Sequence, residues 1–196
     1  MMLEGRTAMV TGIGPGMGRD ISLAFAREGA SVALGGRTLS RLEAVAEEVE
    51  ALGVRAFPVV CDIADEAQCT EAVNAAATEL GRLDILVNNA YDGGDAKTFM
   101  DADFDRWRQT IEVNLFGSLA MTRAAVPHLE ASGDGRVIMI NTMSTQRIQE
   151  KWGAYAASKG ALATVTKTLA LELGPRGIRV NGINPDGVVR GSGIFA

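Results

Sequence analysis

Residues 7–18 read Thr-Ala-Met-Val-Thr-Gly-Ile-Gly-Pro-Gly-Met-Gly, a short apolar run that leads directly into a glycine-rich turn. Such a run predicts a buried strand, and the pattern that follows the turn predicts a helix. Glycines between them let backbone amides approach a pyrophosphate, which then lies at the positive N-terminal end of the helix. A plain tight turn needs fewer glycines, so we expect a nucleotide cofactor here. The turn residues expected to contact it are Gly12, Gly14, Gly16, Met17 and Gly18.

Strand and helix patterns alternate along the rest of the chain. Further apolar runs, typical of buried parallel strands, lie at 31–34, 55–60, 84–88, 136–141 and 179–183. Helical patterns lie at 17–28, 40–52, 66–80, 104–130 and 154–173, and the first four are followed by Gly29, Gly53, Gly81 and Gly133. This order predicts an α/β fold with a doubly wound parallel sheet, which binds ligands at the carboxyl ends of its strands.

The end of the second predicted strand bears on the choice of cofactor. An NAD-preferring site would place a carboxylate here to accept hydrogen bonds from the ribose hydroxyls. The chain has Gly36 at that place, followed by Arg37. Arg37 would attract a 2′-phosphate, with Thr38 and Arg41 in support, although it could also be a solvated loop charge. We therefore expect NADP to be preferred, with NAD possible.

Polar residues also follow the third and fourth predicted strands. Asp62 and the amide of Ile63 could face the adenine edge, or Asp62 could cap the next helix; we leave both open. Asn88, Asn89 and Ala90 follow the fourth strand, where the ligand crevice is expected. Buried asparagines can also fix neighbouring backbone, so this triplet suggests a site without defining one.

Residues 153–161 read Gly-Ala-Tyr-Ala-Ala-Ser-Lys-Gly-Ala within a predicted helix. Tyr155 and Lys159 stand four residues apart and therefore share one face of that helix. A free phenol has a pKa near ~10, and an ammonium beside it would lower that pKa by charge attraction. A phenol tuned in this way could exchange a proton with an alcohol oxygen. The pattern is common by chance, so its meaning depends on the other motifs.

Two further side chains have contrasting interpretations. Asn114 lies inside the long helical pattern, where its amide would compete for backbone hydrogen bonds, so it predicts a kink or a polar network. His128 is the only histidine and has no acid or thiol at metal spacing, so it is expected to be structural and no metal site is expected.

Composition narrows the classes of protein to consider. The chain has 196 residues, 47% of them hydrophobic, and a formal net charge of −5 without a basic stripe, so nucleic acid is an unexpected partner. No apolar run approaches the roughly 20 residues of a membrane span, and residues 1–6 are too short and polar for a signal peptide. Cys61 and Cys69 fit no metal or disulfide pattern, which favours a reducing, cytoplasmic location.

Together these motifs resemble the classical short-chain dehydrogenase/reductase family over nearly the whole chain. The resemblance implies a Rossmann fold with three αβα layers, and hydride transfer between nicotinamide and a small-molecule carbonyl or secondary alcohol. It implies that Tyr155 is the acid/base, that Lys159 binds the nicotinamide ribose, and that Asn114 holds the helix and a relay water. It also implies homodimers or homotetramers packed through the Asn114 and Tyr155 helices. Further cofactor contacts implied by it are Asn89, Ala90, Pro185, Gly187 and Val188.

The family also uses a hydroxyl that holds the substrate oxygen, usually in an Asn-x-Ser-Ser strand end. Thr142 stands thirteen residues before Tyr155 and seven after Gly135, the family's usual separations. A competing alignment pairs Asn141 with the family asparagine and selects Ser144, with a two-residue deletion. If the strand continues, both hydroxyls point the same way, since they differ by two positions. We select Thr142 and keep Ser144 as the alternative.

Three departures from the family pattern affect the expected activity. Tyr91 replaces the glycine of Asn-Asn-Ala-Gly, and Asp186 interrupts the usual Pro-Gly pair. The sequence ends at Ala196, before the lid and last strand of family members, so we expect one catalytic domain over 1–196 with an incomplete substrate pocket. One alternative is a non-catalytic NAD(P)-binding sensor. Another is an enoyl-thioester reductase, which is less favoured because such enzymes usually space the tyrosine and lysine more widely.

Overall fold

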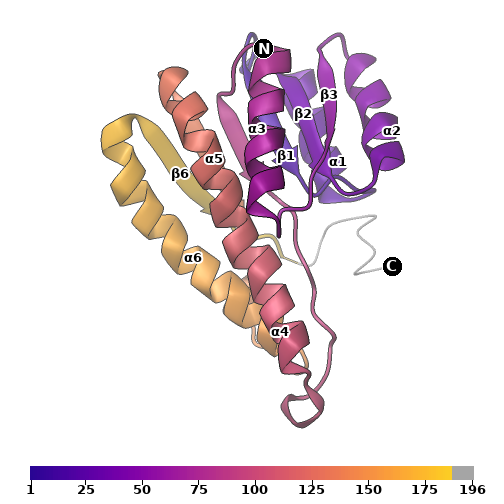
Figure 1. Ribbon diagram of the computed structural model, residues 1–196, viewed down its shortest axis with the longest axis vertical. Coiled ribbons are helices and arrows are strands. Elements are labelled where there is room, and N and C mark those ends of the chain that lie inside the picture. The colour runs from indigo at the N-terminus through magenta and orange to yellow at the C-terminus, as the bar shows by residue number, and fades with distance from the viewer. Residues whose placement is uncertain (187–196) are drawn as a thin grey trace.

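The computed structural model describes residues 1–186, and in this part of the chain it has one parallel six-stranded sheet (Figure 1). The spatial order is β3-β2-β1-β4-β5-β6, with every neighbouring pair parallel. The order reverses beside β1, which creates the crevice where such sheets bind ligands. The fold class predicted from the sequence is therefore confirmed. The strands are β1 (Thr7–Thr11), β2 (Ser31–Gly36), β3 (Ala56–Val60), β4 (Ile85–Asn88), β5 (Gly135–Ile140) and β6 (Ile178–Ile183).

Helices cover both faces of the sheet, and each face has its own core. Successive residues of β1 alternate between the cores: Met9 packs with the side chains of α3, α5 and α6, whereas Ala8 and Val10 pack with those of α1 and α2. Figure 1 shows α3, α5 and α6 running across one face. The result is a three-layer αβα arrangement. The helices are α1 (Met17–Arg27), α2 (Leu39–Glu50), α3 (Glu66–Leu80), α4 (Phe104–Ile111), α5 (Ser118–Ala131) and α6 (Gly153–Leu173). None of them is long and apolar enough to cross a membrane.

The long helix predicted at 104–130 is interrupted. Residues Glu112–Gly117 form a π-helical segment between α4 and α5, so one predicted helix is two helices joined by a wider turn. Asn114 lies in that segment and is fully buried. Its side chain bonds outside its own helix, which is the polar network that an interior asparagine predicts. Such π segments often occur at functional sites.

One of the two interpretations of Asp62 is wrong. The residue that caps α3 is Asp65, whose Oδ1 accepts hydrogen bonds from the amides of Ala67 (2.9 Å) and Gln68 (3.1 Å). Asp62 instead accepts one from the amide of Ala64, at 3.1 Å. Because α3 begins four residues after Asp62, only Asp65 is placed to reach the free amides of its first turn.

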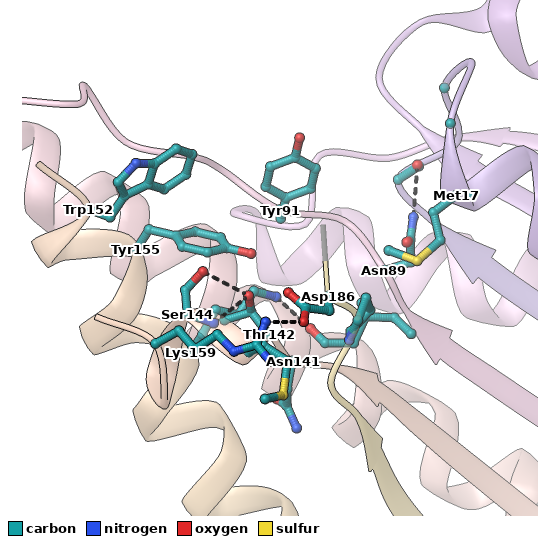
Figure 2. A pocket seen from close by; sticks show the side chains of 18 of the residues that line it. Met17, Asn89, Tyr91, Asn141, Thr142, Ser144, Trp152, Tyr155, Lys159 and Asp186 are labelled. Atoms are coloured by element: carbon teal, nitrogen blue, oxygen red, sulfur yellow. Dashed lines mark hydrogen bonds and ion pairs between the residues drawn. The ribbon is translucent and has the colours of Figure 1, made fainter. Parts of the chain in front are cut away.

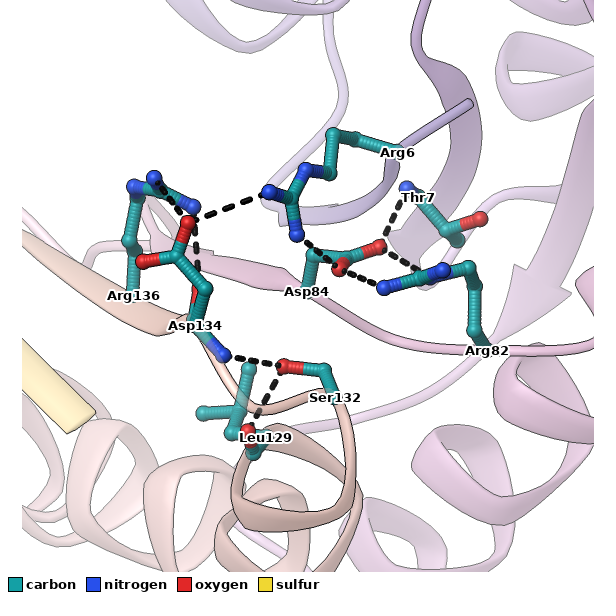
Figure 3. A network of polar contacts seen from close by, with 8 residues as sticks. All are labelled: Arg6, Thr7, Arg82, Asp84, Leu129, Ser132, Asp134 and Arg136. Atoms are coloured by element: carbon teal, nitrogen blue, oxygen red, sulfur yellow. Dashed lines mark hydrogen bonds and ion pairs between the residues drawn. The ribbon is translucent and has the colours of Figure 1, made fainter. Parts of the chain in front are cut away.

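A cluster of charges joins the amino-terminal ends of the strands (Figure 3). The Asp84 side chain, just before β4, is fully buried, and its two oxygens accept hydrogen bonds from Arg82 (2.6 and 2.8 Å), Arg6 (2.9 Å) and the amide of Thr7 (2.8 Å). Arg6 also contacts Asp134 at 3.1 Å. Burial alone would raise the pKa of Asp84, but the bonds from Arg82, Thr7 and Arg6 outweigh it and lower that pKa.

We expect Asp84→Asn to lower the free energy of unfolding by about 3 kcal/mol, because it removes the buried charge that compensates two arginines. Urea denaturation at pH 7 measures this. Since the folded pKa of Asp84 is lowered, its contribution is present above the ordinary value of 3.8 and is lost as the pH falls through the folded pKa. Glu130→Gln, which breaks an exposed pair with Arg176, is the control and should change little. Equal losses in both variants would contradict the assignment.

Candidate active site

A cavity of about 410 Å³ lies at the carboxyl ends of the strands, beside the glycine turn (Figure 2). Most of the residues predicted for the site line it. They are Gly12, Gly14, Gly16, Met17, Gly18, Asn89, Thr142, Ser144, Tyr155, Lys159 and Pro185. Five predicted cofactor contacts do not line it, namely Arg37, Thr38, Asp62, Ile63 and Ala90. Gly187 and Val188 lie outside the described residues.

Close backbone approach explains two of the glycines. Gly12 has φ +73°, and a Cβ there would overlap the Cα of Ala90. At Gly18 a Cβ would lie 2.5 Å from the carbonyl oxygen of Gly12, so the start of α1 could not pack against the turn. A Cβ on Gly14 would meet no atom within 4 Å, so this glycine faces open space at the cavity. The turn therefore has the shape of a cradle whose backbone is open to a ligand.

Asn89 and Thr11 hold this turn in place. The Asn89 amide nitrogen Nδ2 donates to the carbonyl oxygens of Thr11 (2.9 Å) and Gly12 (3.1 Å). The Thr11 hydroxyl accepts from the amides of Asn89 (3.1 Å) and Ala90 (3.2 Å) and donates to the carbonyl of Val87 (3.2 Å). Both interpretations of the asparagine triplet thus apply, since Asn89 fixes backbone and also lines the cavity. The role of Thr11 was missed because nothing in the sequence shows which strand lies beside β1.

The end of β2 lies next to the turn, although the side chains after β2 and β3 do not line the cavity. The Ile13 amide donates to the carbonyl of Gly35 at 3.1 Å. This bond places the turn beside Gly35 and Gly36, the two residues before Arg37. Arg37 is exposed, and among residues 1–186 it has no ion-pair partner. Ile63 is buried and packs closely against Gly117. A Cβ on Gly117 would lie 2.8 Å from the carbonyl oxygen of Ile63.

Lys159 is the largest fully buried side chain, with 1% of its surface exposed. Lys159 is one of the residues that line the cavity, and its Nζ donates to the carbonyl oxygen of Ile140 at 2.7 Å. Burial lowers the pKa of Lys159 to about 8, because water no longer stabilises the ammonium.

Tyr155 faces the same cavity, but its pKa differs from the sequence-based expectation. Burial raises the pKa of Tyr155, and the nearby Thr142 side chain lowers it by less. Lys159 is not among the groups that lower it, since its ammonium is directed to Ile140. The prediction that Lys159 lowers the phenol pKa is therefore wrong for this arrangement. Loss of hydration, which sequence spacing cannot show, is the larger effect.

Both candidate hydroxyls line the cavity, but the backbone that carries them is not the strand that was expected. β5 ends at Ile140, so the premise that the strand continues through Ser144 is wrong. Thr142 caps a short 3₁₀ turn, Met143–Thr145, and its Oγ1 accepts from the Ser144 amide at 3.2 Å. The two hydroxyl oxygens are also 3.2 Å apart (Figure 2). Both hydroxyls line the cavity, and the Thr142 side chain is the one of the two that lowers the pKa of Tyr155, so the selection of Thr142 stays a prediction with this support.

Asn114 does not line the cavity, but its side chain hydrogen-bonds to two separate segments, the loop after β4 and helix α6. Its Oδ1 accepts from the Asp92 amide (2.7 Å), and its Nδ2 donates to the Asp92 carbonyl (2.9 Å) and to the Ser158 hydroxyl (2.9 Å). Ser158 in turn donates to the carbonyl of Tyr155 at 2.8 Å. The predicted role of holding the helix is thus visible as a connection between the loop after β4 and α6.

Known proteins resemble this chain in sequence and in structure. A family model described as short chain dehydrogenase matches residues 6–192. The 7alpha-hydroxysteroid dehydrogenase of Escherichia coli strain K12 is 34% identical over 189 residues, which are 96% of this chain and 73% of that protein.

Two solved structures show the same arrangement. Carveol dehydrogenase from Mycobacterium avium, in complex with NAD, has a TM-score of 0.90 and 28% identity over 94% of this chain and 71% of that one. The 3-ketoacyl-(acyl-carrier-protein) reductase from Brucella melitensis, complexed with NADH, has a TM-score of 0.88 and 35% identity, covering 93% and 75%. The likeness therefore extends over nearly the whole of this chain.

Proposed function

The chain belongs to the short chain dehydrogenase family, whose members are oxidoreductases acting on CH–OH groups, and we propose that it interconverts a carbonyl and a secondary alcohol with Tyr155 as acid and base. The observation that carries this proposal is the convergence of Tyr155, Thr142 and Lys159 on one cavity beside the glycine turn. We propose that residues 1–196 act as a single dinucleotide-binding and catalytic domain.

The residues present fit a nicotinamide dinucleotide. The turn around Gly14 offers open backbone at the start of α1, which suits a pyrophosphate. Lys159 and Tyr155 lie at the other part of the cavity, where they would hold the nicotinamide ribose. When bound, the cofactor supplies or accepts the hydride.

The side chains then supply the proton and hold the substrate. In the reductive direction, the hydroxyls of Thr142 and Tyr155 bind the carbonyl oxygen, and the Tyr155 phenol donates its proton to that oxygen. Burial raises the pKa of Tyr155, which keeps the phenol in the protonated form that a proton donor needs. Lys159, whose Nζ donates to the Ile140 carbonyl, would hold the nicotinamide ribose beside Tyr155.

The test is direct. NADPH and NADH are titrated separately against the protein, and the tighter binder is then used to screen carbonyls and alcohols. Turnover of at least one carbonyl supports the proposal. Cofactor binding without turnover across the panel would instead support a non-catalytic sensor, an alternative that no contact described above favours.

We propose that NADP is preferred to NAD, supported by Arg37, which has no ion-pair partner within residues 1–186, and by the lack of a carboxylate at Gly36. Arg37→Ser should raise the Kd for NADPH about tenfold or more, because a charge-assisted hydrogen bond to the 2′-phosphate is lost, and change the Kd for NADH less than about twofold. Fluorescence titration measures both. Arg123→Ser, a change of an exposed arginine on α5, is the matched control. Equal changes for the two cofactors would contradict the preference.

We also propose a cytoplasmic homodimer or homotetramer that packs through α5 and α6. Exposed apolar side chains support this, since Leu171 on α6 is 80% exposed and Phe116, just before α5, is 52% exposed. Light scattering should give a mass of two or four chains in wild type, and Leu171→Glu should shift it toward one. A monomeric wild type at micromolar concentration would contradict the proposal.

A further inference from the structure

Two aromatic rings flank the ring of Tyr155 in the cavity. The Trp152 ring centroid lies 5.4 Å from that of Tyr155, with 73° between the ring planes. The Tyr91 centroid lies 6.3 Å away, with an angle of 72°. Figure 2 shows both rings next to the Tyr155 ring, with Trp152 toward one end of the cavity and Tyr91 toward the other. We call the space bounded by Tyr91, Trp152 and Tyr155 the aromatic slot.

The Tyr91 wall is fastened through its neighbour Asp92. The Asp92 carboxylate accepts hydrogen bonds from Arg106 (2.7 and 2.8 Å) and from the Thr110 hydroxyl (3.0 Å), both on α4. Its backbone amide and carbonyl both bond to the side chain of Asn114. Because Asn114 also bonds to α6, the loop that carries Tyr91 is fixed relative to the helix that carries Tyr155.

The Trp152 wall is fastened at the start of α6. The carbonyl of Trp152 accepts from the Ala156 amide at 2.8 Å, in the first turn of the helix. The next residue is Gly153, where a Cβ would lie 2.8 Å from two ring atoms of Trp107. The indole of Trp107 therefore packs directly against that backbone. The backbone that carries each wall is therefore held by contacts outside the slot, which reduces the ordering that a substrate must bring about on binding.

Polar groups are placed at the edges of the slot. The hydroxyls of Thr142 and Ser144 lie at its catalytic end, where the carbonyl oxygen would bind. Arg147, which also lines the cavity, forms an ion pair with Asp186. The aromatic side chains that line the cavity are Tyr91, Trp152 and Tyr155, so the ring surface of the cavity is gathered in the slot.

We propose, resting on the oxidoreductase function above, that the aromatic slot makes this site selective for substrates whose carbonyl or carbinol carbon bears a flat, uncharged ring. With the carbonyl oxygen at Tyr155 and Thr142, a ring attached to the carbonyl carbon lies between Tyr91 and Trp152. Aromatic contacts of this kind favour a ring over an alkyl chain, and a chain also loses more rotational freedom on binding. Tyr91 and Trp152 are thus specificity-determining residues.

The test compares acetophenone with a straight-chain methyl ketone of equal carbon number. The proteins compared are wild type, Tyr91→Leu, Trp152→Leu and Tyr91→Phe. For each, kcat/KM is measured for both ketones with the preferred cofactor. The Kd of each ketone is measured separately, by calorimetry on the protein saturated with oxidised cofactor. We expect acetophenone to be preferred, and each leucine variant to reduce the ratio of the two kcat/KM values about 3- to 10-fold, mostly through KM. Tyr91→Phe should retain the preference. Phe99→Leu, a change of an exposed phenylalanine outside the cavity, should leave the ratio as in wild type.

The binding measurement separates this proposal from the proposed function. Turnover of both ketones with no preference for acetophenone, or a ratio insensitive to both leucine changes, overturns the slot and leaves the oxidoreductase function standing. Tighter binding of acetophenone that depends on Tyr91, but no turnover, supports the slot as a ring-binding site and overturns the function. If neither ketone binds or reacts, both proposals are overturned.

Discussion

Tyr155→Phe should lower kcat/KM for carbonyl reduction about 10²- to 10⁴-fold while the protein stays folded and binds NADPH with a Kd within about threefold of wild type. The variant keeps the ring that packs against Trp152 and Tyr91 and removes only the hydroxyl. The expected loss is therefore that of the proton donor alone. Steady-state kinetics and a fluorescence titration with NADPH measure the two quantities. Near-wild-type turnover would show that another group supplies the proton.

The two neighbouring hydroxyls provide the matched comparison for this result. Thr142→Val should reduce kcat/KM more than Ser144→Ala, because we propose Thr142, whose side chain lowers the pKa of Tyr155, as the catalytic hydroxyl. We expect about 10²-fold for Thr142, comparable to the loss of one donor to a developing oxyanion. A larger effect at Ser144 would assign the catalytic hydroxyl to the alternative position.

Lys159→Met should have opposite effects on activity and on stability. Activity should fall about 10²- to 10³-fold, because the side chain proposed to hold the nicotinamide ribose beside Tyr155 is lost. Stability at pH 7 should rise by about 1–3 kcal/mol, since methionine fills a similar volume without a buried charge. The difference between the ordinary lysine pKa of 10.5 and about 8 in the folded protein corresponds to roughly 3 kcal/mol, which sets the upper end of that range.

The lowered pKa of Lys159 also predicts how the free energy of unfolding changes with pH. Between about pH 8 and 10.5 the unfolded chain still holds the Lys159 proton and the folded chain has released it. Wild type should therefore gain stability as the pH rises through that range, and Lys159→Met should not. Urea denaturation at several pH values measures the difference. Lys167→Met, on the exposed face of the same helix, is the control. Destabilisation of the Lys159 variant at pH 7 would mean that its bond to Ile140 outweighs the burial of its charge.

Local sequence was sufficient for the order of elements and for the glycine turn. β1 begins and ends as the apolar run predicts, and β6 differs from its run by one residue. The glycines after the first four predicted helices all have positive φ, between +77° and +89°. These features depend on neighbours in the chain, because apolar periodicity and backbone freedom are properties of short segments. The interruption at Glu112–Gly117 could only be anticipated as a kink or polar network at Asn114.

Contacts between distant segments decided the chemistry of the site. The spacing of Tyr155 and Lys159 predicts that both side chains share one cavity, and both line it. The spacing does not predict the direction of the shift in the phenol pKa, because that shift depends on burial by the whole fold. Likewise, Asn114 was expected to form a network whose partners, Asp92 and Ser158, come from segments 22 and 44 residues away. The sequence by itself determined which residues could do this chemistry and where the cofactor turn lies. Only the tertiary structure decided how far each group is removed from water and which aromatic rings stand beside it, because desolvation and ring packing arise between elements that the sequence leaves far apart.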